Sequence, residues 1–429
     1  MAEPVARRAP ATVSPGRLDR FCRRAVRRSL ASFEQSRIEL LDRTSGGGVE
    51  RFGVGGAGQP AVAVEIHDPR FWQKVALGGT VGAGEAYFEG MWDASDLTAL
   101  VRLFVRNRAG MERVEGGMAR WLRPLLRRWH ARRENTPAGA RRNVAAHYDL
   151  GNDFFERLLD PTMTYSCALF ERPGATLEEA QVAKLDRVCR KLGLRGGHRL
   201  VEIGTGWGSL AIHAARTTGC RVTTTTLSKE QARLARERIA AAGLADRIEV
   251  VERDFRDLAG GGLAGAFDRL VSIEMIEAVG LRLLPRYFAE CARLLRPDGA
   301  AAIQAITIDE AIFESACRGV DFIQRWVFPG SALPSLSSMV SAWRATDLRL
   351  VHLEDLTAHY PPTLRAWAEN LTAHRDELEA RGYDRRMRRL FEFYLAYCEG
   401  GFLERSIGDV QMVLAKPGFR EVPIPGARS

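Results

Sequence analysis

The chain has 429 residues, of which 46% are hydrophobic, and its formal net charge is +9 at pH 7. A chain of this length buries a sizeable core and usually makes two domains. Its longest apolar runs fall short of the ~18 to 20 residues that a membrane-spanning helix needs. The basic N-terminus lacks the apolar segment of a secretory signal. These features exclude an integral membrane protein and a secreted one, and predict a soluble protein.

Seven cysteines are scattered along the chain without any Cys-x-x-Cys pair. An odd, unpatterned set of this kind favours a reducing cytosol. It argues against a disulfide framework and against a structural zinc site. We therefore expect no bound metal.

The positive charge is concentrated in the first third of the chain. Residues 1–145 contain 25 Lys and Arg against 15 Asp and Glu, whereas the remainder contains 37 against 38. Such an asymmetry predicts a polyanionic partner, either nucleic acid or an anionic lipid surface.

The N-terminal part of the chain reads as a basic arm followed by a small domain. Residues 1–45 are basic with helical character and end at a Ser-Gly-Gly-Gly breaker, and residues 46–135 alternate short strands, helices and glycine-rich turns. Within them, residues 120–134 form an amphipathic pattern with arginines opposite Trp and Leu. Such a helix either packs on its own domain or lies on a membrane surface. We expect a small α+β domain over 46–135, associated with lipid, a second domain over 136–415 and a tail over 416–429.

From about residue 185 the chain alternates between strand and helix patterns. The predicted strands cover 198–204, 220–228, 247–254, 267–274 and 300–308, and helices are predicted between them at 209–217, 229–243 and 284–296. This alternation predicts an α/β fold with a doubly wound, mostly parallel sheet. Ligands of such sheets bind at the carboxyl ends of the strands.

A glycine-rich loop follows the first of these strands. It reads Glu202-x-Gly204-x-Gly206-x-Gly208, so the third glycine comes one residue too early for the dinucleotide pattern. An acidic residue two positions before the first glycine would repel a pyrophosphate, but it tolerates the ammonium group of an amino acid. The loop therefore indicates S-adenosylmethionine as the cofactor.

The next two strands supply candidate groups for the rest of that cofactor. After the second strand, Thr226, Leu227 and Gln231 lie where hydrogen bonds to the ribose diol are needed. After the third strand, Asp254 offers a hydrogen bond to adenine and Phe255 a stacking surface. We predict that these five residues bind the nucleoside.

At this point the chain resembles the cyclopropane-fatty-acid synthase family. The resemblance covers roughly residues 75–415 and is carried by "GAGEAYFEGMW", "HYDLGNDFFERLLDPTMTYSCALF", "GTGWGS", "SIEMIEAVG", "DFIQRWVFPGSALPS" and "FYLAYCEGGF". It implies a seven-stranded, Rossmann-like methyltransferase domain. It also implies that a one-carbon unit passes from S-adenosylmethionine to the double bond of an unsaturated acyl chain in a membrane phospholipid. A dimer at the inner face of the membrane is expected from the same family.

The resemblance also implies a set of site residues. In the family a bound bicarbonate is thought to act as the base, and its ligands map to the backbone of Cys167, to Glu277 and to Tyr360. Cys398 maps to a cysteine that lines the active site, and Tyr165 and Ser166 map to the segment that closes over the cofactor. Without the resemblance, Tyr360 reads as a packed turn residue and Cys398 as a small buried hydrophobe. Glu277 could be a solvated acid, but its place at the carboxyl end of a strand favours a functional carboxylate.

Gln304 is the departure from the family pattern that matters. Well-known members carry a histidine at this position, and an amide can donate and accept hydrogen bonds but cannot titrate. The substitution therefore bears directly on bicarbonate binding and on ring closure. The resemblance implies a cyclopropane fatty acid as product, and Gln304 leaves a methyl- or methylene-branched chain as the alternative.

Two other functional classes remain open at this stage. A small-molecule methyltransferase would share the catalytic domain, but the joint presence of Cys167, Glu277, Tyr360 and Cys398 argues against it. A nucleic-acid-binding protein is suggested by the basic charge alone, and no RNA-binding signature supports it.

Overall fold

The computed structural model describes residues 17–34, 37–54, 61–108 and 151–421 of the chain. The predicted amphipathic helix at 120–134, the motif residue His147 and the end of the tail from residue 422 lie outside these ranges. The chain divides into two compact units, one formed by residues 1–124 and 385–393 and the other by 125–384 and 394–429.

The N-terminal unit combines a four-stranded sheet with helices. Its elements are α1 (Arg17–Ala31), β1 (Ile38–Asp42), β2 (Val49–Phe52), β3 (Val62–Ile66), α2 (Arg70–Phe88), β4 (Trp92–Ala94) and α3 (Leu97–Arg106). The strand order is β2-β1-β3-β4, and β1 is parallel to β3 and antiparallel to β2. The sequence predicted a separate arm over residues 1–45, but α1 and β1 belong to this same unit. The reason is that α1 buries Cys22, Val26 and Leu30 while β1 pairs in the centre of the sheet.

The larger unit is the predicted α/β domain. Its helices are α7 (Asn152–Leu158), α8 (Leu177–Lys191), α9 (Ser209–Thr218), α10 (Lys229–Ala241), α11 (Leu284–Leu294), α12 (Glu310–Cys317), α13 (Leu336–Trp343), α14 (Tyr360–Ala373), α15 (Arg375–Ala380) and α16 (Arg385–Leu403). Its strands are β5 (Arg199–Ile203), β6 (Arg221–Thr225), β7 (Ile248–Val251), β8 (Phe267–Ile273), β9 (Leu295–Ile308), β10 (Arg349–Asp355) and β11 (Ile407–Ala415). Helix α16 begins in the N-terminal unit and ends in this one.

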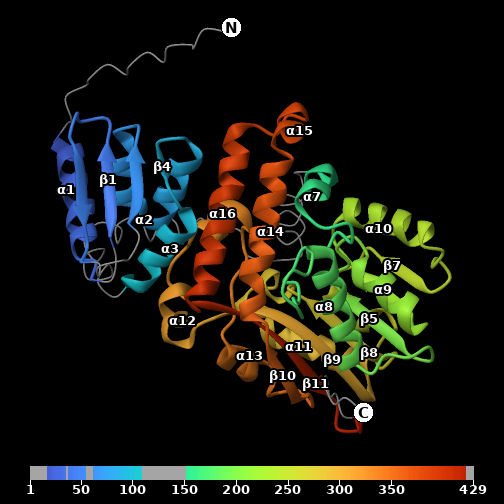
Figure 1. Ribbon diagram of the computed structural model, residues 1–429. Coiled ribbons are helices and arrows are strands. Elements are labelled where there is room, and N and C mark those ends of the chain that lie inside the picture. Colours follow the sequence, from blue (N-terminus) through green and yellow to red (C-terminus); the bar gives the residue numbers. More distant parts are fainter. Residues whose placement is uncertain (1–16, 35–36, 55–60, 109–150, 422–429) are drawn as a thin grey trace. The chain divides into compact units, whose positions relative to one another are not determined.

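The seven strands form one sheet in the order β10-β11-β9-β8-β5-β6-β7. Strands β9, β8, β5, β6 and β7 are parallel, whereas β11 is antiparallel to both of its neighbours. This confirms the predicted doubly wound, mostly parallel seven-stranded sheet (Figure 1). The carboxyl ends of β5, β6, β7 and β8 meet at one edge because these strands are parallel.

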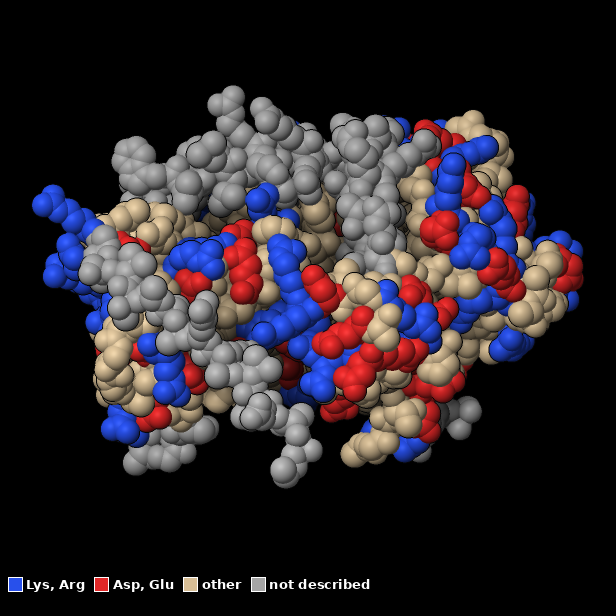
Figure 2. Space-filling view, turned by 90° about the horizontal axis from the view of Figure 1, so that it is seen from above, with Lys and Arg blue, Asp and Glu red and all other residues tan. Residues whose placement is uncertain are grey.

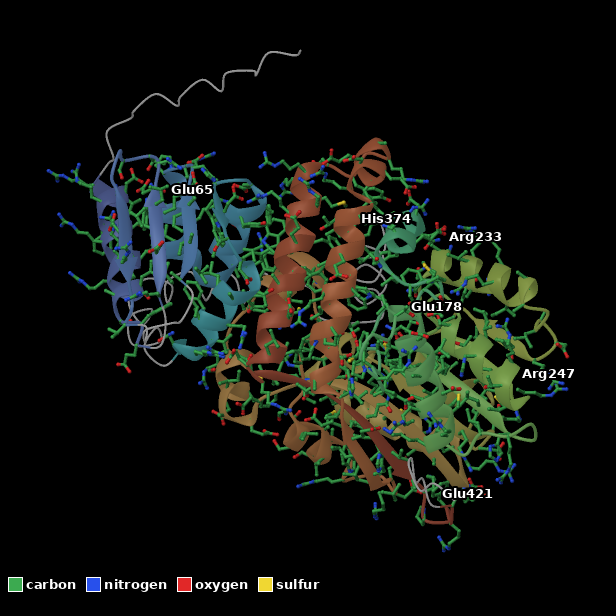
Figure 3. All side chains as sticks on the ribbon, in the orientation of Figure 1. Glu65, Glu178, Arg233, Arg247, His374 and Glu421 are labelled. Carbon is green, nitrogen blue, oxygen red and sulfur yellow. The ribbon has the colours of Figure 1, made fainter. Side chains whose placement is uncertain are left out.

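Helices cover both faces of this sheet and bury a separate apolar layer on each. Side chains of α8, α9 and α10 pack on one face, and side chains of α11 and α13 pack on the other. Charged residues such as Arg233 on α10 and Arg247 before β7 point outward (Figure 3). The face under α8 is unusual because alternate positions of β9 and β11 carry Gln304, Asp409 and Gln411, all of which are almost fully buried. Buried polar groups of this kind require partners, and they lead to the site.

Candidate active site

The glycine-rich loop between β5 and α9 adopts the conformation that a cofactor cradle needs. Gly204, Gly206 and Gly208 have φ angles of 102°, 51° and 86°, a region that residues with a Cβ rarely enter. The amide of Gly204 donates to the carbonyl of Thr225 over 3.0 Å, which joins the loop to β6. A Cβ built on Gly206 would meet no atom within 4 Å, so the backbone is open to a ligand there.

Side chains that were predicted to bind the cofactor lie at the ends of the neighbouring strands. Glu202 is buried beside the loop, where the Thr224 hydroxyl donates to it over 2.6 Å, and burial raises its pKa to about 8. Thr226 donates to the Gln231 side chain over 3.0 Å, so these two predicted residues contact each other. Leu227, which follows Thr226 in the sequence, is half-buried.

Asp254 and Phe255 follow the end of β7, as expected. The Asp254 carboxylate accepts from the backbone and the guanidinium of Arg256, which keeps its pKa below the ordinary value despite burial. The ring of Phe255 packs edge-on against Tyr287 at 5.4 Å. The adenine role of these two residues remains a prediction.

The centre of the site is a carboxylate that the sequence did not single out, that of Glu274 at the end of β8. Its Oε1 accepts from the backbone N–H of Cys167 at 2.8 Å and from the Gln304 amide nitrogen at 2.7 Å. Its Oε2 accepts from the Tyr360 hydroxyl at 2.7 Å. Cys167, Gln304 and Tyr360 were all predicted to belong to the site, and the structure brings them together around this one side chain.

Glu274 has a left-handed backbone, with φ 46°. A residue with a Cβ adopts this conformation at a cost of about 1–2 kcal/mol, and such strain is concentrated at functional sites. Burial raises the pKa of the Glu274 carboxyl above its usual value, while the hydrogen bonds from Cys167 and Tyr360 oppose that shift. The site therefore contains a fixed carboxylate whose basicity exceeds that of an exposed glutamate.

Two further buried carboxyls and one buried ammonium surround Glu274. Glu277 accepts from the backbone N–H of Ile306 over 2.6 Å, and burial, followed by the charge of Glu274, raises its pKa to about 8. Asp409 accepts from Gln304 over 2.9 Å, and its pKa is raised by burial and by the same two glutamates. Lys184 donates to the Ser166 hydroxyl over 2.7 Å and favours the ionised carboxylates. At neutral pH these three carboxyls therefore do not all ionise.

The residues present do not fit a bicarbonate ion in the expected place. The donors predicted to hold one, the Cys167 amide and the Tyr360 hydroxyl, already bond to the Glu274 carboxylate, as does Gln304. An added anion would lie against that carboxylate in a buried site and would find its donors occupied. No step is therefore assigned to bicarbonate.

Aromatic rings surround the remaining site residues. Tyr165 lies with its ring 5.1 Å from Trp367 and with its hydroxyl 3.0 Å from that of Tyr394. Tyr360 stacks on Phe402 at 4.1 Å. Cys398 is one helical turn after Tyr394, and burial followed by the charge of Asp321 keeps it a thiol by raising its pKa.

The functional groups that the sequence analysis missed are Glu274, Lys184, Asp409 and Gln411. Glu274 is three residues before Glu277, and its position at the end of a predicted strand was the one available signal. The other three come from a helix and a strand distant in sequence, so their convergence is visible only in the fold.

Comparison with known proteins identifies the family of this chain. Residues 135–412 match the family described as mycolic acid cyclopropane synthetase. The chain is 39% identical to the tuberculostearic acid methyltransferase UfaA1 of Mycobacterium tuberculosis over 375 residues, which is 85% of this chain and 86% of that protein. It is 33% identical to the cyclopropane-fatty-acyl-phospholipid synthase of Escherichia coli over 86% of this chain and 91% of that one. The crystal structure of the mycolic acid cyclopropane synthase CmaA1 complexed with SAH and CTAB superimposes with a TM-score of 0.58 at 33% identity, covering 64% of this chain and 98% of that one.

Proposed function

Since this chain belongs to the mycolic acid cyclopropane synthetase family of S-adenosylmethionine-dependent methyltransferases, we propose that it alkylates the double bond of an unsaturated acyl chain in a membrane phospholipid. The observation that carries the proposal is the Glu274 carboxylate, held by Cys167, Gln304 and Tyr360. Alkylation of an alkene leaves a carbocation, and a product forms only when a base removes a proton. Glu274 is that base.

Bound S-adenosylmethionine supplies an electrophilic methyl group. The chain's own residues do the rest. The glycine loop and the ends of β5 to β7 hold the cofactor, and the burial of the site excludes the water that would quench a cation. The faces of Tyr165, Tyr360 and Trp367 stabilise the positive charge on the acyl chain. Glu274 then accepts a proton from the transferred carbon, and the C–H electron pair forms the last carbon–carbon bond.

We propose that this electron pair becomes the second bond of a C=CH2 group, so that the product is a methylene-branched acyl chain. Gln304 is neutral and Glu274 is held at the end of β8 by three hydrogen bonds, so we infer that a proton leaves the newly added carbon only after the cation has rearranged. A cation that is not deprotonated at once undergoes a 1,2-hydride shift to the more substituted carbon, and proton loss from the methyl group then gives the methylene. The similarity to UfaA1, which is named for tuberculostearic acid, supports this choice.

Immediate ring closure to a cyclopropane is the second candidate. The 33% identity to the cyclopropane-fatty-acyl-phospholipid synthase over most of both chains favours it. The same base and the same proton serve both outcomes, and only the hydride shift separates them.

Expression in a host that makes unsaturated phospholipids, followed by lipid extraction, tests the proposal. Both products add the mass of one CH2 unit, so proton NMR must distinguish vinylidene signals from upfield cyclopropane signals. We expect vinylidene signals with the native protein and none with Glu274→Gln. Cyclopropane signals would establish the second candidate, and unchanged product with Glu274→Gln would refute the role of the base.

We also propose that the protein reaches its substrate by binding an anionic membrane surface through helix α1. No helix within the described residues is both long and apolar enough to cross a bilayer. One face of α1 exposes Arg17, Arg24 and Arg28, which form no ion pair with any described residue, beside Leu18 and Phe21, which are 52% and 55% exposed. Arginines around an exposed aromatic ring suit the headgroup region of anionic lipid, where each cation contributes up to about 1 kcal/mol.

Beside the buried stripe of α1, two other arginines hold the helix to its unit. There Arg23 pairs with Asp42 at 2.8 Å, Arg27 pairs with Glu50, and both lie over the Trp72 ring. In Figure 2, Lys and Arg side chains project from the N-terminal unit at the left edge of the view. The folding contacts and the exposed cations thus belong to different residues of one helix.

Vesicle flotation tests this surface with matched variants. We expect Arg24→Glu combined with Arg28→Glu to abolish binding to vesicles rich in phosphatidylglycerol. Arg233→Glu combined with Arg247→Glu, which changes the net charge equally in the other unit, should still bind. Equal binding by both double variants, or equal binding of the native protein to neutral vesicles, would refute the proposal.

A further inference from the structure

A row of buried polar side chains runs across the sheet beneath α8. Gln304 on β9 and Gln411 on β11 are direct cross-strand partners, and Gln411 is also paired with Glu354 on β10, which is partly exposed. Cross-strand partners project from the same face of a sheet. Lys191, the last residue of α8, lies over this row, and its side chain is fully buried.

The row forms one continuous chain of hydrogen bonds that ends at Glu274. The Lys191 ammonium donates to Oε1 of Gln411 over 2.6 Å, and Nε2 of Gln411 donates to Oε1 of Gln304 over 2.9 Å. Nε2 of Gln304 then donates to Glu274 over 2.7 Å and to Asp409 over 2.9 Å.

The direction of this chain is set at its lysine end. An ammonium can only donate, whereas a glutamine amide has an acceptor at one end and donors at the other, with nearly the same shape. Packing therefore does not favour either orientation of the Gln304 amide, but a hydrogen-bond donor at the other end of the row does. We propose that Lys191 is a positioning residue that, through Gln411, keeps the N–H groups of Gln304 turned toward the Glu274 carboxylate.

This inference rests on the proposed role of Glu274 as the base, and that role explains why the orientation needs support. While Glu274 is ionised, it holds the Gln304 N–H groups itself. Once it has accepted a proton, its own O–H becomes a donor, and a flipped Gln304 would offer it a carbonyl oxygen. That flip would stabilise the protonated acid and slow its return to the basic form. With Lys191 and Gln411 in place, a flip would bring two N–H donors face to face, and it would leave the carbonyl oxygen of Gln304 against Asp409.

Other titratable groups also face the two ends of this row of hydrogen bonds, Glu274 and Lys191. Around Glu274 they are Cys167, Lys184, Glu277, Tyr360, Tyr394 and Asp409, and around Lys191 they are Arg187, His352, Glu354 and Asp409. A change at Lys191 alters their fields as well as the chain's polarity. The test must therefore separate charge from orientation.

Three variants make that separation. Lys191→Met removes both the donor and its charge, and Gln411→Leu breaks the same chain without any change of charge. Glu354→Gln breaks the 2.6 Å ion pair with Lys191 but leaves the donor in place. The measurement is the pH profile of kcat and KM for methyl transfer, with S-adenosylmethionine affinity by calorimetry and thermal midpoints alongside.

We expect Lys191→Met and Gln411→Leu to move the acid limb of the kcat profile upward by about one pH unit. Lipid KM and cofactor affinity should stay as in the native protein, and Glu354→Gln should keep the native limb. A native pH profile for Gln411→Leu would overturn the proposal. This variant decides the test by itself if Lys191→Met fails to fold. The proposal would also be overturned if Glu354→Gln moved the acid limb of the kcat profile as far as the other two variants do. If instead Glu274→Gln keeps native activity, the proposed base itself has failed, whatever these variants do.

Discussion

Replacing Glu274 with glycine would remove the base while keeping every group that holds it. The donors from Cys167, Tyr360 and Gln304 would then face a space the size of a carboxylate. A positioned general base contributes about 100- to 10,000-fold to a rate, which corresponds to about 3 to 5 kcal/mol. Glycine also adopts φ 46° without the strain of a side chain, which offsets part of the cost of leaving these donors without an acceptor.

We expect Glu274→Gly to lose activity by that factor and to regain part of it when formate or bicarbonate is added. The assay is transfer of labelled methyl groups to phospholipid over a series of anion concentrations, and the recovered rate should saturate. Glu274→Gln is the matched control because its amide fills the same space and leaves no room for an anion. Native activity of Glu274→Gly without any anion, or equal recovery in both variants, would refute the reasoning.

Three more predictions concern single groups. Tyr360→Phe keeps the stack on Phe402 but removes one donor to Glu274, so kcat should fall about tenfold and its acid limb should move to higher pH; an unchanged pH–rate profile would argue against the contact. Gly206→Ala forces a left-handed backbone and fills the open side of the loop, so calorimetry should show cofactor binding weakened by about tenfold. Glu202 is protonated in the folded state up to about pH 8 but ionises near its ordinary pKa when unfolded, so its contribution to stability is lost as pH rises through 8. In urea titrations without cofactor, the free energy of unfolding of Glu202→Gln should therefore rise relative to that of the native protein by up to about 1 kcal/mol for each pH unit between 6 and 8. A difference that does not change with pH would show that Glu202 is not protonated in the folded state.

The parts of this protein that were predictable from sequence are those with local signals. Hydrophobic alternation and helix periodicity located β5 to β9 and the helices between them, and the spacing of Gly204, Gly206 and Gly208 predicted a loop in which all three glycines have positive φ. Family resemblance supplied Cys167 and Tyr360, which the structure places on one carboxylate.

The remaining features depend on contacts that no local pattern encodes. Strand β1 was read as part of an arm because its five residues find their partners, β2 and β3, only in the folded sheet. The importance of Glu274 depends on its backbone conformation and on donors that lie about 30 to 110 residues away. The register between β9 and β11 alone brings Gln304 and Gln411 together.

A base that is covalently part of the polypeptide has a consequence for the conditions under which this protein works. Its occupancy is complete in every molecule, so turnover should be indifferent to dissolved carbon dioxide and to competing small ions in the medium. The same attachment fixes the position of the carboxylate, so only acyl chains whose length and double-bond position bring the double bond to Glu274 should react.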